Sequence, residues 1–596
     1  MYNIYLFQPQ YSVDFRNEVN YYLPYAAGCL WSYVSQFSDI TENYTLKDIV
    51  FKRDPVDQYV NNMNDPKLCG FSCYVWNERY CLAAAKKIKE RWPDCIIQFG
   101  GPQANSSMTK YNFIDTIVMG EGEEIFLDIL QDILKNKPLE LFYNKKRLKD
   151  LNIPSPYISG VFDNIVKSNP DAMWATTLET NRGCPFACTF CDWGGVTYSK
   201  IHKFDFKKIA KELEWMKNNR VVYFFLADAN FGIFKERDLE IAKLIRKTID
   251  DSDLETVNIQ YAKNSTDVVF EIAKTIGPYS KGITVSVQSM SEITLDAIKR
   301  KNLDMNDIRH MMELSAQHGV STYTELILGL PGETIDSWKA GITELLEIGQ
   351  HENIDVWFAQ LLPNAELASE ESRRKFGISS ILAADFMTLN TKDPDDIKEM
   401  VEIINSTNSM SMSELVECYL YGWMIIHFHI NGYTQLISKY ARNVKNIPYR
   451  LFYDTLFSEL QKDTAIGSHY TEFKKIIEDY LTYGIVSDVL VGLWGLHTLS
   501  YKFINDHRLD ISKLGVNSLK KLTNIDSSLE NLQNSFIVNN DNQYPCILTT
   551  EYNVFTGEQT RTEYTFNSKV DTLSMKDFYT LRRKGLIKNI ASTRNI

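Results

Sequence analysis

The stretch NRGCPFACTFCDWGG, residues 181–195, places three of the chain's ten cysteines close together. Gly183 and Pro185 keep this loop from continuing as a regular helix. A structural zinc site normally takes four protein ligands, yet residues 195–400 hold no further cysteine and no histidine pair at ligand spacing. Closely spaced thiolates are typical iron–sulfur ligands, and three of them would leave one iron of a 4Fe–4S cluster open. The expected ligands are Cys184, Cys188 and Cys191. The alternative, three buried structural cysteines, is disfavoured by the glycine and polar neighbours.

Composition is typical of a globular protein with a large core. The chain has 596 residues, 44% of them hydrophobic and 23% charged, which allows several domains. Its net charge of −12 disfavours non-specific binding to nucleic acid or to anionic membrane. We find no apolar run of membrane-spanning length and no signal peptide at the start of the sequence. We therefore expect a cytoplasmic protein whose cysteines are reduced.

Strand and helix patterns alternate from residue 175 onward. The apolar runs at 175–181, 221–232 and 282–289 predict buried strands, and each is followed by an amphipathic helical pattern. This alternation predicts a parallel sheet with right-handed crossovers, in which functional side chains sit at the carboxyl ends of the strands. The polar residues found at those ends are Asp228, Asn230, Lys263, Gln288, Ser289 and Glu325.

The first 145 residues show a second α/β pattern, which predicts a small doubly wound domain. Glycine-bearing loops stand at the predicted strand ends, where glycine lets the backbone approach a bulky ligand. Ordinary tight turns are the alternative interpretation. The residues of these loops are Gly70 and Ser72, then Gly100, Gly101 and Pro102, then Gly120, Glu121 and Gly122.

The same region holds five more cysteines, which we interpret as core. Cys69 and Cys73 share one face of a predicted strand about 13 Å apart, too far apart for one cluster. Cys81 and Cys95 lie in apolar runs, as buried cysteines often do. A second iron–sulfur cluster is therefore not expected here.

The cysteine loop resembles that of the radical S-adenosylmethionine (SAM) superfamily, CxxxCxxC with an aromatic residue, here Phe190, before the last cysteine. The resemblance implies a partial (β/α)6 barrel whose first strand leads into the cluster loop. It also implies that the open iron takes the amino and carboxylate groups of SAM, and that one electron then cleaves SAM to a 5′-deoxyadenosyl radical. The backbone around Phe190 would lie near the adenine.

Further contacts to SAM follow from the same resemblance. ADANFG, residues 227–232, stands where the superfamily binds the SAM amino group, but it lacks the usual Gly-Gly-Glu form. The contact is therefore assigned to the backbone near Ala227, with Asp228 and Asn230 beside it. Gln288 and Ser289 match the position that meets the ribose hydroxyls, and LILGLPGE, residues 326–333, resembles the strand beside adenine. For that last stretch a simple Gly-Pro turn is the alternative.

The N-terminal region resembles the cobalamin-binding domain of cobalamin-dependent radical SAM enzymes. The segments that carry this resemblance are LPYAAGCLWSYV, CGFSCYVWN, FGGPQA and VMGEGEE. The Asp-x-His-x-x-Gly motif of other cobalamin domains is missing, and residues 1–140 contain no histidine, so none from this domain can coordinate cobalt from below. Trp76 stands where members of this subgroup approach the lower face of the cobalt, which would disfavour a sixth ligand. The alternative is that Trp76 is a core residue.

The last 220 residues are less informative. Residues 393–400, DPDDIKEM, are interpreted as charged surface, followed by helices and a β-hairpin over 544–568. His427 and His429 do not share a helix face, so we interpret them as core or surface residues and not as metal ligands. We expect this region to cap the barrel and shape substrate access.

The sequence therefore predicts an α/β protein with a doubly wound cobalamin-binding domain (1–145), a linker (146–172), a radical SAM barrel (173–375) and a mostly helical domain with a hairpin (376–596). The implied cofactors are a 4Fe–4S cluster, SAM and cobalamin. The predicted function is methyl transfer to an unactivated carbon of a small-molecule or peptide substrate, with flavodoxin or ferredoxin as electron donor and no nucleic acid or membrane partner. A non-methylating radical reaction, such as cyclisation or rearrangement, and a non-catalytic cobalamin sensor are the alternatives.

Overall fold

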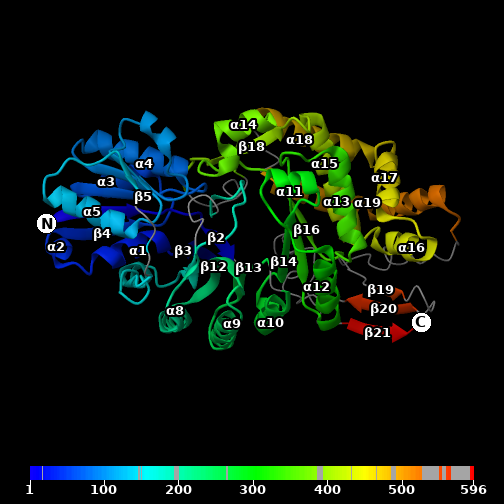
Figure 1. Ribbon diagram of the computed structural model, residues 1–596, viewed down its shortest axis with the longest axis horizontal. Helices are drawn as coiled ribbons and strands as arrows, with labels where there is room; N and C mark the ends of the chain where they lie inside the picture. Colours follow the sequence, from blue (N-terminus) through cyan, green and yellow to red (C-terminus); the bar gives the residue numbers. More distant parts are fainter. Residues whose placement is uncertain are drawn as a thin grey trace. The chain divides into compact units, whose positions relative to one another are not determined.

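Figure 1 shows the computed structural model of the chain. Its internal contacts divide the chain into two compact units, which we describe separately. Unit 1 comprises Met1–Ala262, Gln360–Arg373 and Leu382–Glu402, and unit 2 comprises the remainder. These units do not coincide with the predicted segments, so the domain boundaries stay a prediction. The structure describes residues 1–15, 18–144, 148, 151–193, 200–263, 266–385, 394–430, 432–464, 466–484, 492–525, 550–552, 559–564 and 591–595.

Unit 1 begins with a six-stranded sheet in the order β4-β1-β5-β6-β7-β8, and every neighbouring pair in it is parallel. One face of the sheet packs on helices α3 and α4 through a buried apolar cluster that includes Phe71, Ile97 and Ile88. Helices α1 and α5 contact each other, and Figure 1 places them with the other face. Helices on both faces give the doubly wound arrangement predicted from the alternating patterns. The bounds are β1 Tyr2–Phe7, α1 Tyr25–Val34, α2 Ser38–Thr41, β4 Tyr44–Val50, α3 Val56–Asn62, β5 Pro66–Ser72, α4 Glu78–Arg91, β6 Ile96–Gly100, η1 Ser106–Lys110, β7 Thr116–Met119, α5 Glu123–Leu134 and β8 Phe142–Asn144.

A second sheet of unit 1 has the order β13-β12-β9-β3-β2. Strands β9, β12 and β13 are parallel neighbours, as the sequence predicts for the start of the barrel. The short strand β3, from the N-terminal region, extends this sheet in parallel beside β9, which the sequence patterns did not indicate. The bounds are β2 Val13–Phe15, β3 Glu18–Tyr22, α6 Asp163–Ser168, β9 Met173–Leu178, β10 Asn181–Arg182, β11 His202–Lys203, α8 Phe206–Asn218, β12 Val221–Phe231, α9 Lys235–Asp250, β13 Thr256–Tyr261, η3 Glu366–Ala368 and α14 Glu370–Phe376.

Unit 2 holds the other three parallel strands of the barrel series, in the order β14-β15-β16. Helix α13 begins with a capping box between Thr334 and Ser337, which satisfies amide groups at its first turn. The bounds are α10 Thr266–Ile276, η2 Gly277–Tyr279, β14 Ile283–Gln288, α11 Glu292–Ala297, α12 Met305–His318, β15 Thr322–Leu328, α13 Ile335–Glu347 and β16 Ile354–Phe358.

The C-terminal part of unit 2 is mostly helical, as predicted. Helix α15 starts with a capping box between Ser411 and Glu414, and α18 ends at Gly484, whose φ of 65° suits glycine. A small antiparallel sheet β19-β20-β21 confirms a hairpin near 544–568 and adds a third strand. The bounds are β17 Ser379–Ala384, β18 Met400–Ser406, α15 Met412–Met424, a π-helix Ile425–Ile430, α16 Gln435–Lys445, α17 Tyr449–Leu460, α18 Gly467–Tyr483, α19 Gly492–Leu522, β19 Thr550–Tyr552, β20 Gln559–Tyr564 and β21 Ala591–Asn595.

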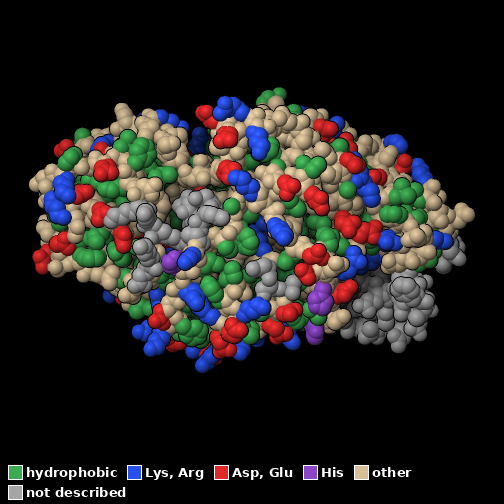
Figure 2. Space-filling model, in the orientation of Figure 1, with side chains coloured by type: hydrophobic (Ala, Val, Ile, Leu, Met, Phe, Trp, Pro, Cys, Tyr) green, Lys and Arg blue, Asp and Glu red, His purple; other side chains and the backbone are tan. Residues whose placement is uncertain are grey.

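Acidic and basic side chains are interspersed over the face of the molecule that Figure 2 shows. Among the described residues, none of the helices is both long and apolar enough to cross a membrane.

Candidate active site

The cysteine loop follows strand β9 and begins with the short strand β10, which pairs with β11. Gly183 has a φ of 121°, a conformation that favours glycine and turns the chain into the loop. Cys184 and Cys188 are buried, Cys191 is half-buried, and none of the three forms a disulfide. The amide of Cys191 donates to the carbonyl of Cys188 at 3.1 Å, which holds the second half of the loop in a turn.

The three thiols do not by themselves form a preassembled metal centre. Within the part of the chain that the structure describes, no three or more His, Cys, Asp or Glu side chains are arranged to hold a metal ion. The assignment of Cys184, Cys188 and Cys191 as cluster ligands therefore stays a prediction. Half-buried Phe190 lies on the same loop, and the carbonyl of the preceding residue, Thr189, accepts from Leu367 at 2.8 Å.

The end of strand β12 supplies two polar side chains with different tasks. The side-chain Nδ2 of Asn230 donates to Sγ of Cys184 at 3.4 Å, while the side-chain Oδ1 of Asn230 is buried and has no hydrogen-bond partner. Asp228 instead accepts from the amides of Thr180 (2.7 Å) and Asn181 (3.1 Å). It also accepts from the Asn181 side chain at 2.6 Å and from the Thr180 hydroxyl. Both oxygens of Asp228 are thus used to fasten the entry of the cysteine loop.

Burial dominates the titration of Asp228 and raises the pKa of its carboxyl to about 7, against the lowering effect of those hydrogen bonds. Ala227 is half-buried, and its predicted backbone contact with SAM stays a prediction. Of the polar residues in 227–232, Asn230 is therefore the better candidate for a direct contact at the cluster, and Asp228 the better candidate for support.

A charged cluster that the sequence did not reveal lies beside the cysteine loop. Arg182 pairs with Glu179 at 2.9 Å and with Glu123 of α5 at 2.8 Å, and Tyr25 donates to Glu179 at 3.1 Å. Burial opposes the charge on Glu179, but Arg182 outweighs it and the pKa of this carboxyl is lowered. These ion pairs join the first turn of α5, next to the glycine loop at 120–122, to the start of the cysteine loop.

In unit 2, the two residues predicted to meet the ribose behave differently. Gln288 ends strand β14 with a φ of 59°, an uncommon conformation for a residue other than glycine, and its Oε1 is buried without a partner. The hydroxyl of Ser289 is bound to the carboxylate of Glu333. Glu325 accepts from the Ser286 hydroxyl at 3.3 Å, and burial raises its pKa. Gln288 is thus the member of the pair with a free acceptor.

The glycines of the three loops at the ends of β5, β6 and β7 are of two kinds: some are packed against other parts of the fold, and one borders open space. A Cβ at Gly70 would lie 2.9 Å from Leu6, and one at Gly122 would lie 2.9 Å from Leu30, so these glycines make room for side chains of the fold. A Cβ at Gly100 would make ordinary contacts, whereas Gly120, with a φ of 90°, faces open space. Of these four glycines, only Gly120 therefore offers room on its Cβ side for a ligand.

Gly101 brings two loops together at this end of the sheet. Its φ is 94°, and a Cβ there would lie 2.7 Å from the carbonyl oxygen of Cys73. The amide of Cys73 donates to the carbonyl of Gly100 at 2.7 Å. The polar neighbours are also engaged: Ser72 and Pro102 offer their carbonyls to Asn77 (3.1 Å) and Asn364 (2.8 Å), and the carboxylate of Glu121 accepts from Leu148 at 2.7 Å.

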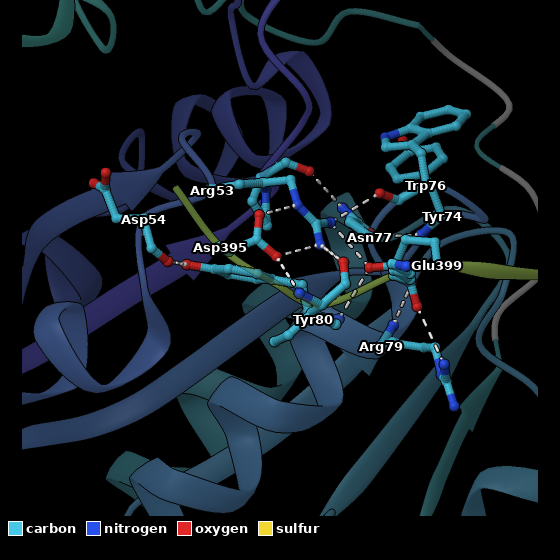
Figure 3. Close-up of polar contacts among 12 residues, drawn as sticks. Arg53, Asp54, Tyr74, Trp76, Asn77, Arg79, Tyr80, Asp395 and Glu399 are labelled. Carbon is cyan, nitrogen blue, oxygen red and sulfur yellow. Dashed lines mark hydrogen bonds and ion pairs between the residues drawn. The ribbon is translucent and has the colours of Figure 1, made fainter. Parts of the chain in front are cut away.

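Trp76 lies in the loop between β5 and α4 and is not a core residue. It is half-buried, its ring stacks on Tyr74 with centroids 4.5 Å apart and an interplanar angle of 11°, and its Nε1 is buried without a partner. Its carbonyl accepts from Arg53 at 3.1 Å (Figure 3). The indole is therefore held by stacking and by its backbone, with a polar atom left for a bound group.

The remaining cysteines and histidines fit the structural interpretation. The five N-terminal cysteines are buried, with Cys69 and Cys95 in contact at 3.7 Å between their sulfur atoms. His427 and His429 are buried in the π-helix, and His429 bonds to His351 at 2.9 Å and to Tyr453 at 2.6 Å. Both histidines are core residues, which is one of the two positions, core or surface, that the sequence predicted for them.

Comparison with known proteins decides the family. The Radical SAM superfamily profile matches residues 178–343. Over 487 residues the chain is 34% identical to the 2-(S-pantetheinyl)-carbapenam-3-carboxylate methyltransferase of Streptantibioticus cattleyicolor, which covers 77% of this chain and 71% of that protein. It is 34% identical over 491 residues to the cobalamin-dependent radical SAM methyltransferase TokK of Streptomyces tokunonensis, with 77% and 71% covered. The chain belongs to the cobalamin-dependent radical SAM methyltransferases.

One solved structure is similar to this chain in fold. The cobalamin-dependent S-adenosylmethionine radical enzyme OxsB, solved with aqua-cobalamin and S-adenosylmethionine bound, aligns with a TM-score of 0.51 at 15% identity, over 90% of this chain and 84% of that one. The likeness shows a shared fold. As a member of the methyltransferase family, the chain is an enzyme and not the non-catalytic sensor considered from the sequence.

The methyltransferase family implies a 4Fe–4S cluster, SAM and cobalamin, and the types of donor at the predicted positions suit these groups. Thiols are the donors that iron–sulfur clusters take. Three buried polar atoms without a hydrogen-bond partner, in Asn230, Gln288 and Trp76, lie at the predicted contact positions. Gly120 leaves open space at the end of the first sheet. A buried polar atom without a hydrogen-bond partner requires an explanation, and a bound group would supply one at these three positions.

Proposed function

We propose that this enzyme places a methyl group on an unactivated carbon of a small molecule related to a carbapenam carboxylate. The observation that carries the proposal is the 34% identity, over 487 residues, to an enzyme that methylates 2-(S-pantetheinyl)-carbapenam-3-carboxylate. When bound, the cluster and SAM supply the radical chemistry and cobalamin supplies the methyl group. The protein's task is then to hold, orient and shield these groups.

The proposed roles of the residues follow from their positions. Cys184, Cys188 and Cys191 would hold the cluster, and Asn230 would hydrogen-bond at Cys184. The backbone at Phe190 and Ala227 would contact SAM, the free acceptor of Gln288 would meet its ribose, and Glu325 would be a further contact on the neighbouring strand. The loops that follow β5, β6 and β7 would receive cobalamin, with the open space beside Gly120 facing the ligand and Trp76 against the lower face of the cobalt. The residues proposed for those loops are Gly70, Ser72, Gly100, Gly101, Pro102, Gly120, Glu121 and Gly122.

A one-electron donor is also required, because SAM cleavage at a cluster consumes an electron. We propose a small redox protein such as flavodoxin or ferredoxin for this role.

The test is anaerobic turnover of the reconstituted enzyme with SAM, cobalamin, reductant and 2-(S-pantetheinyl)-carbapenam-3-carboxylate. Mass spectrometry should find a methylated carbapenam that is absent with Cys188→Ser, a variant that lacks one predicted cluster ligand. Abundant 5′-deoxyadenosine without any methylated product, from this substrate or from a carbapenam series lacking the pantetheinyl arm, would contradict the proposed substrate class.

A further inference from the structure

A buried arginine in unit 1 is held by two carboxylates that come from a distant part of the sequence. The side chain of Arg53 is fully buried, and its guanidinium lies 2.8 Å from Asp395 and 2.9 Å from Glu399 (Figure 3). Asp395 is bound bidentately, through Nε and Nη2 of Arg53. The carboxylates are 3% and 0% exposed, so the interpretation of this segment as charged surface is wrong for Asp395 and Glu399, whereas Asp396 and Lys398 are exposed as predicted.

This arginine is fixed on every side that carries a donor. It also donates to the carbonyl of Ile397 at 2.8 Å, and its guanidinium carbon lies 4.2 Å from the ring centre of Tyr11 and 4.9 Å from that of Tyr80. Burial opposes the charge on Arg53, but the hydrogen bonds to Asp395 outweigh it and raise the pKa of the guanidinium. Arg53 is therefore a permanently charged, immobile group.

The remaining hydrogen bond of Arg53 goes to the carbonyl of Trp76, at 3.1 Å from Nη1. Trp76 lies in residues 73–77, the loop that joins β5 to α4, and we call this segment the tryptophan loop. The rest of the loop is tied through Asn77, which donates to Ser72 and Pro9, both at 3.1 Å, and accepts from the amide of Tyr74 at 2.7 Å.

Glu399 fixes the other side of the tryptophan loop. Helix α4 has no side-chain cap from its own N-cap residue, Asn77. Glu399 supplies this cap from far along the chain, because its carboxylate accepts from the amides of Arg79 at 2.7 Å and Tyr80 at 3.1 Å. One carboxylate thus joins the arginine to the first turn of the helix that follows Trp76.

We propose that Arg53, anchored by Asp395 and Glu399, is a positioning residue that fixes the Trp76 backbone and thereby aims the indole at bound cobalamin. This inference rests on the proposed function, in which Trp76 stands against the lower face of the cobalt. Lysine cannot replace the planar fork of arginine, because one ammonium group cannot bind Asp395 bidentately and also reach the Trp76 carbonyl. Displacing a group by about 1 Å can cost about a hundredfold in rate.

The test compares Arg53→Lys with Arg79→Lys, a matched control whose arginine donates to the carbonyl of Lys398 at 3.2 Å but not to Trp76. Electron paramagnetic resonance of bound cob(II)alamin, recorded without SAM, reports the axial environment of the cobalt. We expect the Arg53→Lys spectrum to shift toward that of Trp76→Ala, and Arg79→Lys to match the wild type. If Arg53→Lys does not fold, Asp395→Asn, which keeps an acceptor for Arg53, gives the same comparison in a milder form.

Turnover supplies the second readout. Per folded enzyme, Arg53→Lys should lose at least about tenfold in methylated product while 5′-deoxyadenosine stays within about twofold of the wild type. In a Trp76→Ala background, Arg53→Lys should cause no further loss, because the two act as one unit. An unchanged cob(II)alamin spectrum, a parallel fall of both products, or fully additive losses would overturn the inference. A wild-type enzyme that binds no cobalamin would instead overturn the proposed function.

Discussion

The burial of Asp228 predicts how the stability of the protein depends on pH. Its carboxyl is buried and its pKa is raised from 3.8 to about 7. Because the pKa of the folded state lies above that of the unfolded chain, the folded protein holds the extra proton between these values. The stabilising contribution is fully present below about pH 4 and is lost as the pH rises through 7. Between pH 5 and pH 7 the loss amounts to about 3 kcal/mol, at about 1.4 kcal/mol per pH unit.

The perturbation is Asp228→Asn, which replaces the carboxyl by a group that stays neutral at every pH. Relative to the wild type, the variant should therefore gain about 3 kcal/mol in the free energy of unfolding between pH 5 and pH 8. The assay is the midpoint of thermal unfolding for both proteins across this range. Asp250→Asn, at a carboxylate that is 48% exposed and pairs with Arg246 at 2.9 Å, serves as the control, because an exposed ion pair contributes little to stability.

A flat or falling difference between Asp228→Asn and the wild type as the pH rises would refute this reasoning. It would mean that the four donors from Thr180 and Asn181 keep the carboxylate ionised throughout, so that hydrogen bonding and not burial decides its titration.

Three further predictions concern other parts of the molecule. Gly101→Ala places a Cβ 2.7 Å from a backbone oxygen, so this variant should have a lower thermal unfolding midpoint and should retain less cobalamin after gel filtration. Gly120→Ala, whose Cβ meets no atom within 4 Å, should lower the unfolding midpoint less. Burial lowers the pKa of His351 and His429 and keeps both imidazoles neutral in the folded protein. As the pH is lowered past about 6.5, the thermal unfolding midpoint should therefore decrease, with a loss of at most about 1.4 kcal/mol in the free energy of unfolding per pH unit for each histidine. The variant His351→Gln should make this decrease smaller. Iron analysis of the reconstituted wild-type enzyme should find about four irons per chain, and Cys188→Ser should lose both this iron and the cluster absorbance.

The sequence predicted the strands and the helical faces well because their signals are local. Strand β12 is a continuous run of β-branched and aromatic residues, and it is buried as such a run predicts. The cysteine loop was found from spacing alone. The parallel order of β9, β12 and β13 then follows from the chain order of strands joined by helices.

The sequence did not predict contacts between residues far apart in the chain. Arg53 and Glu399 are separated by 346 positions, so no local pattern indicated that Asp395 and Glu399 would turn inward from a charged segment. A Cβ at Gly70 or Gly122 would meet Leu6 or Leu30, and no local pattern indicated these neighbours. A glycine in the sequence shows that room is needed and does not show what fills it.

The most direct test of the account is the dependence of methyl transfer on cobalamin. With SAM carrying a deuterated methyl group, and with the pantetheinyl carbapenam, we predict that the labelled product, S-adenosylhomocysteine and 5′-deoxyadenosine form together when cobalamin is present. Without cobalamin, the labelled product and S-adenosylhomocysteine should disappear while 5′-deoxyadenosine persists. Labelled product formed equally well without cobalamin would contradict the central claim that this chain is a cobalamin-dependent radical SAM methyltransferase.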